Sequence, residues 1–186
     1  MKIITPLILA FSFLLAQAEE VDVTPTKTPK FPNSEVLNQE SKSLKFYDDL
    51  IKNKVVAINF VFSSCPTICT AMEVNFSQLQ TSLKESGLKD VHLISVTVDP
   101  KTDIPARLKE WSKKFEAKEG WSFITGKPKT IDHLLKELEV FTADVNDHPS
   151  FILVGNDTTG TWKRVNSLAS PKLLSQELSK LAAEKK

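Results

Sequence analysis

The stretch VVAINFVF (residues 55–62), followed by SSCPTIC (residues 63–69), decides the fold. The first part is apolar and rich in β-branched and aromatic residues, which is typical of a strand buried on both faces. In the second part, Pro66 is suited to the first position of a helix, where its missing N–H is not needed. The sequence therefore predicts a buried strand, then Cys65 at the mouth of a helix and Cys69 one turn inside it.

The two cysteines are predicted to lie where sulfur is reactive. A helix N-terminus carries partial positive charge and free N–H groups, and both favour the thiolate, which is the nucleophile and the metal ligand. A separation of four residues places the side chains on one helix face, with Cβ atoms about 5–6 Å apart. This spacing suits two thiolates that grip one metal ion, and a small adjustment also allows a disulfide. A purely stabilising disulfide is the weaker interpretation, because so small a loop gains little.

Length and charge narrow the possible functions. The 186 residues match the size of one domain, and 24 Lys and Arg against 23 Asp and Glu give a net charge of +1. This balance gives no indication of a nucleic-acid partner. The chain has 2 cysteines, both in the one motif, so neither has another cysteine partner within the molecule.

Residues 1–18 are predicted to be a signal peptide. Lys2 is followed by an apolar stretch of signal-peptide length, and Ala16-Gln17-Ala18 gives a small-x-small cleavage pattern. The alternative is an uncleaved N-terminal anchor in the inner membrane. In both cases the domain is exported, with the periplasm as the expected location, where disulfides persist.

The folded domain is predicted at residues 35–186, behind an extended Pro/Thr-rich tether at 19–34. Alternating or continuous apolar runs predict its strands, and apolar residues at helical spacing predict its helices. The expected order is a hairpin within 36–46, a helical turn at 47–53, strand 55–62, helix 71–85, strand 91–98, helix 103–117, strand 121–125, a helix from 130, a loop at 144–149, strand 151–154, a turn at 155–160, strand 161–165 and a helix from 171.

Two of these helices carry specific expectations. Val74, Leu79 and Leu83 are expected on the inner face of the helix over 71–85. Asp103 is expected to cap the N-terminus of the following helix.

This order predicts an α/β fold with a central mixed sheet flanked by helices and an N-terminal β-hairpin extension. A strand that leads through a cysteine into a helix, with a final hairpin and helix, is the thioredoxin-like plan. Ligand chemistry in such sheets collects at the carboxyl ends of the strands. Cys65 and Asp99 are both expected at such ends.

The sequence resembles the Sco/SenC family, thioredoxin-like exported proteins that handle copper for cytochrome c oxidase. The resemblance covers the mature domain and is carried by residues 57–62, Cys65-Pro66 with Cys69, residues 95–100, and Asp147-His148 ahead of an apolar strand ending in Gly155. It implies that Cys65, Cys69 and His148 bind one copper ion.

The chemistry of these ligands agrees with the resemblance. Two thiolates and one imidazole form a soft set that Cu(I) prefers and Cu(II) also accepts. A structural zinc site needs a fourth ligand, for which the sequence offers no obvious candidate. Metal binds deprotonated sulfur, so acid or a Cys65–Cys69 disulfide is expected to block binding. Asp99 is either polar support for the site or a cap at the end of its strand.

Two positions depart from the family pattern: Thr70, where a proline commonly follows the second cysteine, and Pro149, directly after His148. Pro149 resembles the passage from a cis-proline into a strand that faces the redox cysteines of thioredoxins, so it favours disulfide exchange. Three further candidates are weaker: His92 is expected to be structural, His133 solvated and Met72 part of the core.

The leading hypothesis is therefore a copper metallochaperone that acts in assembly of the copper site of cytochrome c oxidase. Its expected partner is the copper-bearing oxidase subunit or another copper or thiol protein, and we expect a monomer near the membrane. The alternative is an exported thiol–disulfide oxidoreductase of the thioredoxin class, so whether the chain is an enzyme stays open. His148 favours the first hypothesis, because disulfide exchange does not need it. A peroxidase is disfavoured, because the nearest arginine in the sequence is Arg107.

Overall fold

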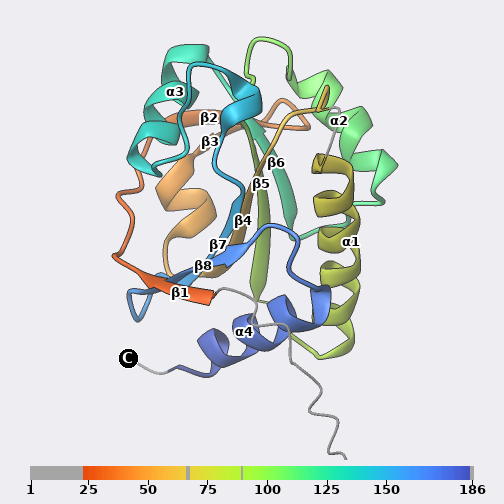
Figure 1. The fold of residues 1–186 in the computed structure, drawn as a ribbon, viewed down its shortest axis with the longest axis vertical. Helices are drawn as coiled ribbons and strands as arrows, with labels where there is room; N and C mark the ends of the chain where they lie inside the picture. Colours follow the sequence, from red (N-terminus) through yellow and green to blue (C-terminus); the bar gives the residue numbers. More distant parts are fainter. Residues whose placement is uncertain (1–22, 66–67, 89, 185–186) are drawn as a thin grey trace, which may run out of the picture.

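The computed structural model describes residues 23–65, 68–88 and 90–184 (Figure 1). The predicted signal peptide and Pro66 lie outside these residues. The elements are β1 (Val23–Thr26), β2 (Glu35–Asn38), β3 (Ser43–Lys45), η1 (Phe46–Ile51), β4 (Val55–Val61), α1 (Cys69–Glu85), β5 (Val91–Thr97), α2 (Pro105–Lys114), β6 (Trp121–Thr125), α3 (Pro128–Glu137), η2 (Val145–Asp147), β7 (Phe151–Asn156), β8 (Thr161–Asn166) and α4 (Pro171–Ala183). None of the helices in this described part has the length and apolarity needed to span a bilayer.

One mixed sheet organises the described residues, with the strand order β1-β8-β7-β4-β5-β6-β2-β3. β4 runs parallel to β5, and β5 runs parallel to β6. β7 lies antiparallel on the other side of β4. The ends of β4, β5 and β6 therefore meet the start of β7 at one edge of the sheet, which is where both cysteines and the loop before β7 are found. This arrangement confirms the predicted α/β class and mixed sheet.

Helices cover both faces of the sheet (Figure 1). Side chains alternate along β4, so Val56, Ile58 and Phe60 pack in one core with η1 and α3. Ala57 packs in the second core, with α1, α2 and α4. Because both faces of β4 are covered, the strand is apolar almost throughout, as its sequence predicts.

The N-terminal segment differs from the predicted tether. β1 pairs antiparallel with β8, with Val23 opposite Val165. Pro25 is tolerated there because β1 is an edge strand. Further along, the Phe31 ring lies 4.7 Å from the Trp162 ring, centroid to centroid. The segment is therefore held against the sheet from Val23 onward, by an open strand edge and by apolar contact.

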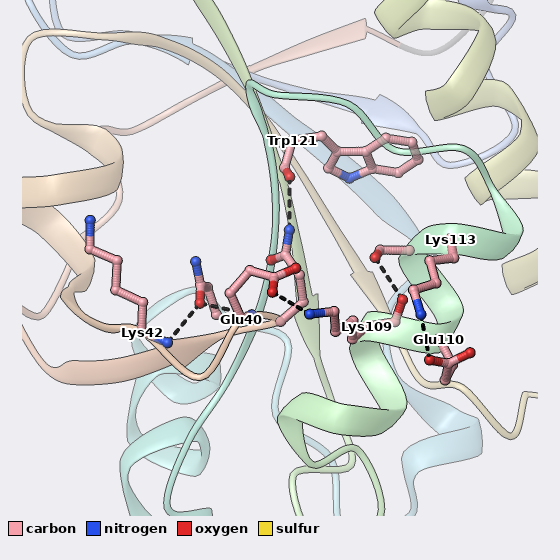
Figure 2. Close-up of polar contacts among 9 residues, drawn as sticks. Glu40, Lys42, Lys109, Glu110, Lys113 and Trp121 are labelled. Atoms are coloured by element: carbon pink, nitrogen blue, oxygen red, sulfur yellow. Dashed lines mark hydrogen bonds and ion pairs between the residues drawn. The ribbon is translucent and has the colours of Figure 1, made fainter.

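The predicted N-terminal hairpin is confirmed, and polar contacts fasten it to the domain. β2 pairs with β3 and also with β6. In the hairpin turn, the Gln39 side chain donates to the Trp121 carbonyl (3.4 Å) and accepts from the Phe123 N–H (2.9 Å). Lys109 of α2 forms an ion pair with Glu40 at 2.5 Å (Figure 2). These contacts make the hairpin part of the sheet and not a separate appendage.

The start of α1 differs from its prediction. The helix begins at Cys69 itself, so this cysteine opens the helix and does not lie one turn inside it. Met72, Phe76, Leu79 and Leu83 set the buried face. Val74 is 41% exposed, so its predicted inward position is wrong.

Helix α2 also starts differently. Its N-cap is Ile104, and no side chain caps it, so the predicted capping role of Asp103 is wrong. Asp103 is instead fully buried. α3 begins at Pro128, two residues before the expected start at Thr130.

Candidate functional site

The two cysteines lie together at the carboxyl end of β4. Cys65 is half-buried, and its N–H donates to the Phe62 carbonyl at 3.1 Å. Cys69 is fully buried at the first position of α1. No disulfide joins the two sulfurs, and the two side chains share a hydrogen bond. This contact is consistent with the prediction that the two cysteines form one unit. Cys65 is the more accessible of the two, and Cys69 is covered.

Cys69 is less acidic than a helix-start position predicts. The pKa of the Cys69 thiol is raised to about 12, chiefly by burial and also by the hydrogen bond with Cys65, while a hydrogen bond with the Phe62 backbone partly opposes the rise. The favourable field of the helix N-terminus is therefore outweighed by loss of water. A metal ion that binds Cys69 must displace a firmly held proton.

His148 lies next to the cysteine loop through Phe62. It directly follows the short helix η2, and its ring meets the Phe62 ring edge-on, with centroids 6.1 Å apart and planes at 81°. Burial lowers the pKa of His148, and the contact of Nδ1 with the Pro149 carbonyl at 3.2 Å partly offsets this. The imidazole is therefore kept neutral near pH 7, which is the form that binds metals.

The structure brings two of the three predicted ligands together. Cys65 and Cys69 are in contact, whereas His148 is linked to them through the Phe62 ring. Within residues 23–65, 68–88 and 90–184, no three His, Cys, Asp or Glu side chains form a group arranged to hold a metal ion. A site with all three ligands requires the loop before β7 to bring His148 closer.

The predicted supporting residues have local contacts. Asp99 follows β5, and its Oδ1 accepts from the Thr102 N–H at 3.3 Å, which is a turn-forming contact. Pro149 is exposed, and no peptide bond among the described residues is cis, so the bond from His148 to Pro149 is trans. The other expectations agree with the structure in that Met72 is buried, His133 is exposed and His92 is half-buried.

Asp103 is the supporting residue that the sequence analysis missed. Its carboxylate accepts from the Ser63 N–H at 3.1 Å, from the Ser63 hydroxyl and from the Thr97 hydroxyl at 2.6 Å. Arg107 Nε donates to Ser63 Oγ at 3.1 Å. These bonds fix the loop two residues before Cys65. The bond between Ser63 and Asp103 joins residues that are 40 positions apart in the sequence, so no local sequence pattern indicates this cluster.

A model of the SCO1/SenC family matches residues 32–183. The chain belongs to the SCO1/SenC family. The SCO1 protein homolog of Bacillus subtilis (strain 168) is 31% identical to this SCO1/SenC chain over 129 residues, which are 64% of this chain and 65% of that relative. The chain thus spans just under two thirds of that relative's length.

Solved structures of the SCO1/SenC family share this fold. BsSco, described as a member of the Sco family of cytochrome c oxidase assembly proteins with a disulfide switch, superimposes with a TM-score of 0.71 at 25% identity, over 87% of this chain and 97% of BsSco. Yeast Sco1 with copper bound gives a TM-score of 0.72 at 19% identity, over 87% and 96% of the two chains. The predicted thioredoxin-like fold is confirmed.

Replacing Asp103 with alanine in this SCO1/SenC chain is expected to lower the free energy of unfolding by about 2 kcal/mol, because three donors lose a charged acceptor. Chemical denaturation measures the change. Asp99→Ala is the matched control, since Asp99 has one longer side-chain bond, and it is expected to cost about 0.5–1 kcal/mol. Equal losses in the two variants would contradict the assigned role of Asp103.

A separate cavity of about 400 Å³ lies away from the cysteines, between the hairpin turn, α2 and the start of β6. Its lysines are already engaged: Lys109 pairs with Glu40 and Lys113 with Glu110 (Figure 2). Lys118 pairs with Glu116 at 3.9 Å. We therefore place the candidate site of this SCO1/SenC chain at the cysteine pair and not in this cavity.

Proposed function

We propose that this chain is a copper metallochaperone that acts in assembly of the copper site of cytochrome c oxidase. The contact between the Cys65 and Cys69 side chains, at the carboxyl end of β4, is the main support for the proposal, because two adjacent sulfurs are the donors that Cu(I) prefers. BsSco is described as a member of a family of oxidase assembly proteins, and yeast Sco1 holds copper, which supports the same role here.

His148 is the third ligand in this proposal. Its neutral imidazole lies against Phe62, whose carbonyl accepts from the Cys65 N–H. If the loop before β7 approaches the cysteines, His148 would complete a two-sulfur, one-nitrogen set around the ion. Three ligands leave the copper open to a partner, which we propose to be the copper-bearing oxidase subunit or another copper or thiol protein. We further propose export to the periplasm, with residues 1–18 as signal peptide or membrane anchor.

The second candidate function is thiol–disulfide exchange. The half-buried Cys65 beside the fully buried Cys69 favours it, since an accessible sulfur can attack a partner disulfide and the covered sulfur can resolve the mixed disulfide. In that reaction the partner disulfide becomes a dithiol, while Cys65 and Cys69 lose two protons and two electrons to form their own disulfide.

Copper titration of the chain in its reduced and oxidised forms tests the proposed function. The reduced form is expected to bind one equivalent of copper, and the oxidised form none, because a disulfide removes both sulfur ligands. Turnover of a model disulfide substrate is measured in parallel. A reduced protein that binds no copper but turns over the disulfide would replace the first function with the second.

His148→Ala is expected to weaken copper binding by about 10- to 100-fold while the Cys65–Cys69 disulfide still forms. Competition with a copper chelator measures the affinity, and thiol counting measures the disulfide. His133→Ala is the matched control, because His133 is exposed on α3. Unchanged copper affinity in His148→Ala would remove His148 from the site.

A further inference from the structure

Glu73 is a buried acid that the proposed copper chemistry does not use. It lies on α1, one turn after Cys69, and has no exposed surface. Its Oε1 accepts from Asn59 Nδ2 at 2.9 Å and from Ser95 Oγ at 3.3 Å. Ser95 Oγ in turn accepts from Trp121 Nε1 at 3.0 Å. The carboxyl group therefore joins α1 to β4 and β5 through one of its two oxygens.

The second oxygen of the same carboxyl group has no hydrogen-bond partner among the residues that the structure describes. Glu73 Oε2 and Asn59 Oδ1 are both buried without a bond in this part of the chain. If Glu73 were ionised, both atoms would be acceptors, and neither could satisfy the other. A single proton on Oε2 would make it a donor, and Asn59 Oδ1 is the unsatisfied acceptor of the amide that already bonds to Oε1. One shared proton would satisfy both atoms.

We propose that Glu73 is a neutral carboxylic acid that exchanges two hydrogen bonds with the Asn59 amide, and that this pair positions the start of α1 on the sheet. Asn59 Nδ2 donates to Oε1, and protonated Oε2 donates to Asn59 Oδ1. Glu73 is a positioning residue, because it acts on the place of Cys69 through the helix. The pairing itself rests on the structure alone, whereas its value for copper binding rests on the proposed function.

The surroundings of Glu73 agree with a neutral acid. Among the described residues, the side chains that hydrogen-bond to it are Asn59 from β4 and Ser95 from β5, and Ser95 accepts in turn from Trp121 of β6; none of these three is charged. On its own helix the nearest titratable group is Cys69, whose burial keeps it a protonated thiol. A buried carboxylate without a cation is costly. Burial raises the pKa of Glu73 to about 8, although the bonds from Asn59 and Ser95 oppose the rise.

The pairing makes stability depend on pH in one direction. The pKa of Glu73 rises from 4.5 in the unfolded chain to about 8 in the folded protein. The contribution of Glu73 to the free energy of unfolding is therefore complete below its pKa in the unfolded chain. This contribution is lost as pH rises through its pKa in the folded protein. Between the two values, the unfolding equilibrium constant is expected to rise about tenfold per pH unit through this one group.

Glu73→Gln separates the proposal from a general packing role. A glutamine amide can exchange the same two bonds with Asn59, but it does not titrate. Stability of wild type and Glu73→Gln is measured by denaturation from pH 5 to 9. The ratio of their unfolding constants is expected to change by about tenfold per pH unit up to about pH 8. A ratio that is constant with pH would overturn the proposal. Glu85→Gln on the exposed surface of α1 is the control and is expected to give a constant ratio.

Infrared spectroscopy reads the proton directly and without copper. At pH 7 the wild type is expected to show the C=O band of a protonated carboxyl group, which Glu73→Gln lacks and which Glu85→Gln retains. Glu73→Leu leaves the Asn59 amide without a hydrogen-bonding partner at position 73, so hydrogen exchange of the first two turns of α1 is expected to be faster in this variant. In Glu73→Gln the slower exchange of the wild type is expected to be restored. Absence of the band in wild type would overturn the neutral acid. Equal exchange in all variants would overturn the positioning role, and neither result bears on whether copper binds.

Discussion

Cys69→Ser is expected to weaken copper binding by about 100-fold or more, because each thiolate supplies a large share of the binding energy at a thiolate site. Cys69 is fully buried and in contact with Cys65, so its sulfur lies beside a metal ion bound at Cys65. Serine keeps the size of the side chain but offers a hard oxygen in place of a soft sulfur. Chelator competition with Cu(I) measures the affinity.

Met72→Leu is the control for this prediction. Met72 is the other sulfur near the start of α1, but it is buried in the core and packs with the apolar side of the helix. A swap of Met for Leu conserves volume and is expected to cost less than about 1.5 kcal/mol of stability, without change in copper affinity. Loss of affinity in Met72→Leu, or full affinity in Cys69→Ser, would contradict the assigned ligands.

Gly155→Ala is expected to lower the free energy of unfolding by about 3 kcal/mol. Gly155 in β7 pairs directly with Trp162 in β8. A Cβ at this position would lie 2.1 Å from Cε3 of the Trp162 ring. The ring cannot move away easily, because it is 2% exposed and packs against Phe31 at 4.7 Å. Thermal and chemical denaturation measure the loss.

Gly126→Ala is the matched control for Gly155→Ala. A Cβ at Gly126 would meet Ile131 Cδ1 at 3.5 Å, an ordinary contact distance. This variant is expected to stay within about 1 kcal/mol of wild type, since alanine also restricts the unfolded chain. A similar loss in both variants would show that the Trp162 contact does not decide the cost.

The sequence predicts the central part of the fold well, because its signals are local. Apolar runs mark β4, β5, β6 and β7, and helical spacing of Ile131, Leu134 and Leu135 marks α3. The hairpin of β2 and β3 is likewise visible from its polar turn. The N-terminal strand is not, because Val23–Thr26 gains its structure only from the open edge of β8.

The site is predictable in its residue types but not in its environment. The spacing of Cys65 and Cys69 indicates a sulfur pair, and the structure places them in contact. Spacing cannot show that burial raises the pKa of Cys69 to about 12, because depth in the core depends on the whole fold. For the same reason, Asp103 is read as a helix cap, although it is a buried acceptor for Ser63 and Thr97. Arg107, distant from the cysteines in sequence, reaches the same loop.

The most direct test is X-ray absorption at the copper edge, on the reduced protein loaded with one equivalent of Cu(I). The method counts the sulfur atoms bound to the metal. We expect two sulfur neighbours in the wild type and in Met72→Leu, and one in Cys69→Ser where any copper is retained. A wild-type spectrum with no sulfur neighbour, or with a single one, would contradict a copper site built on Cys65 and Cys69.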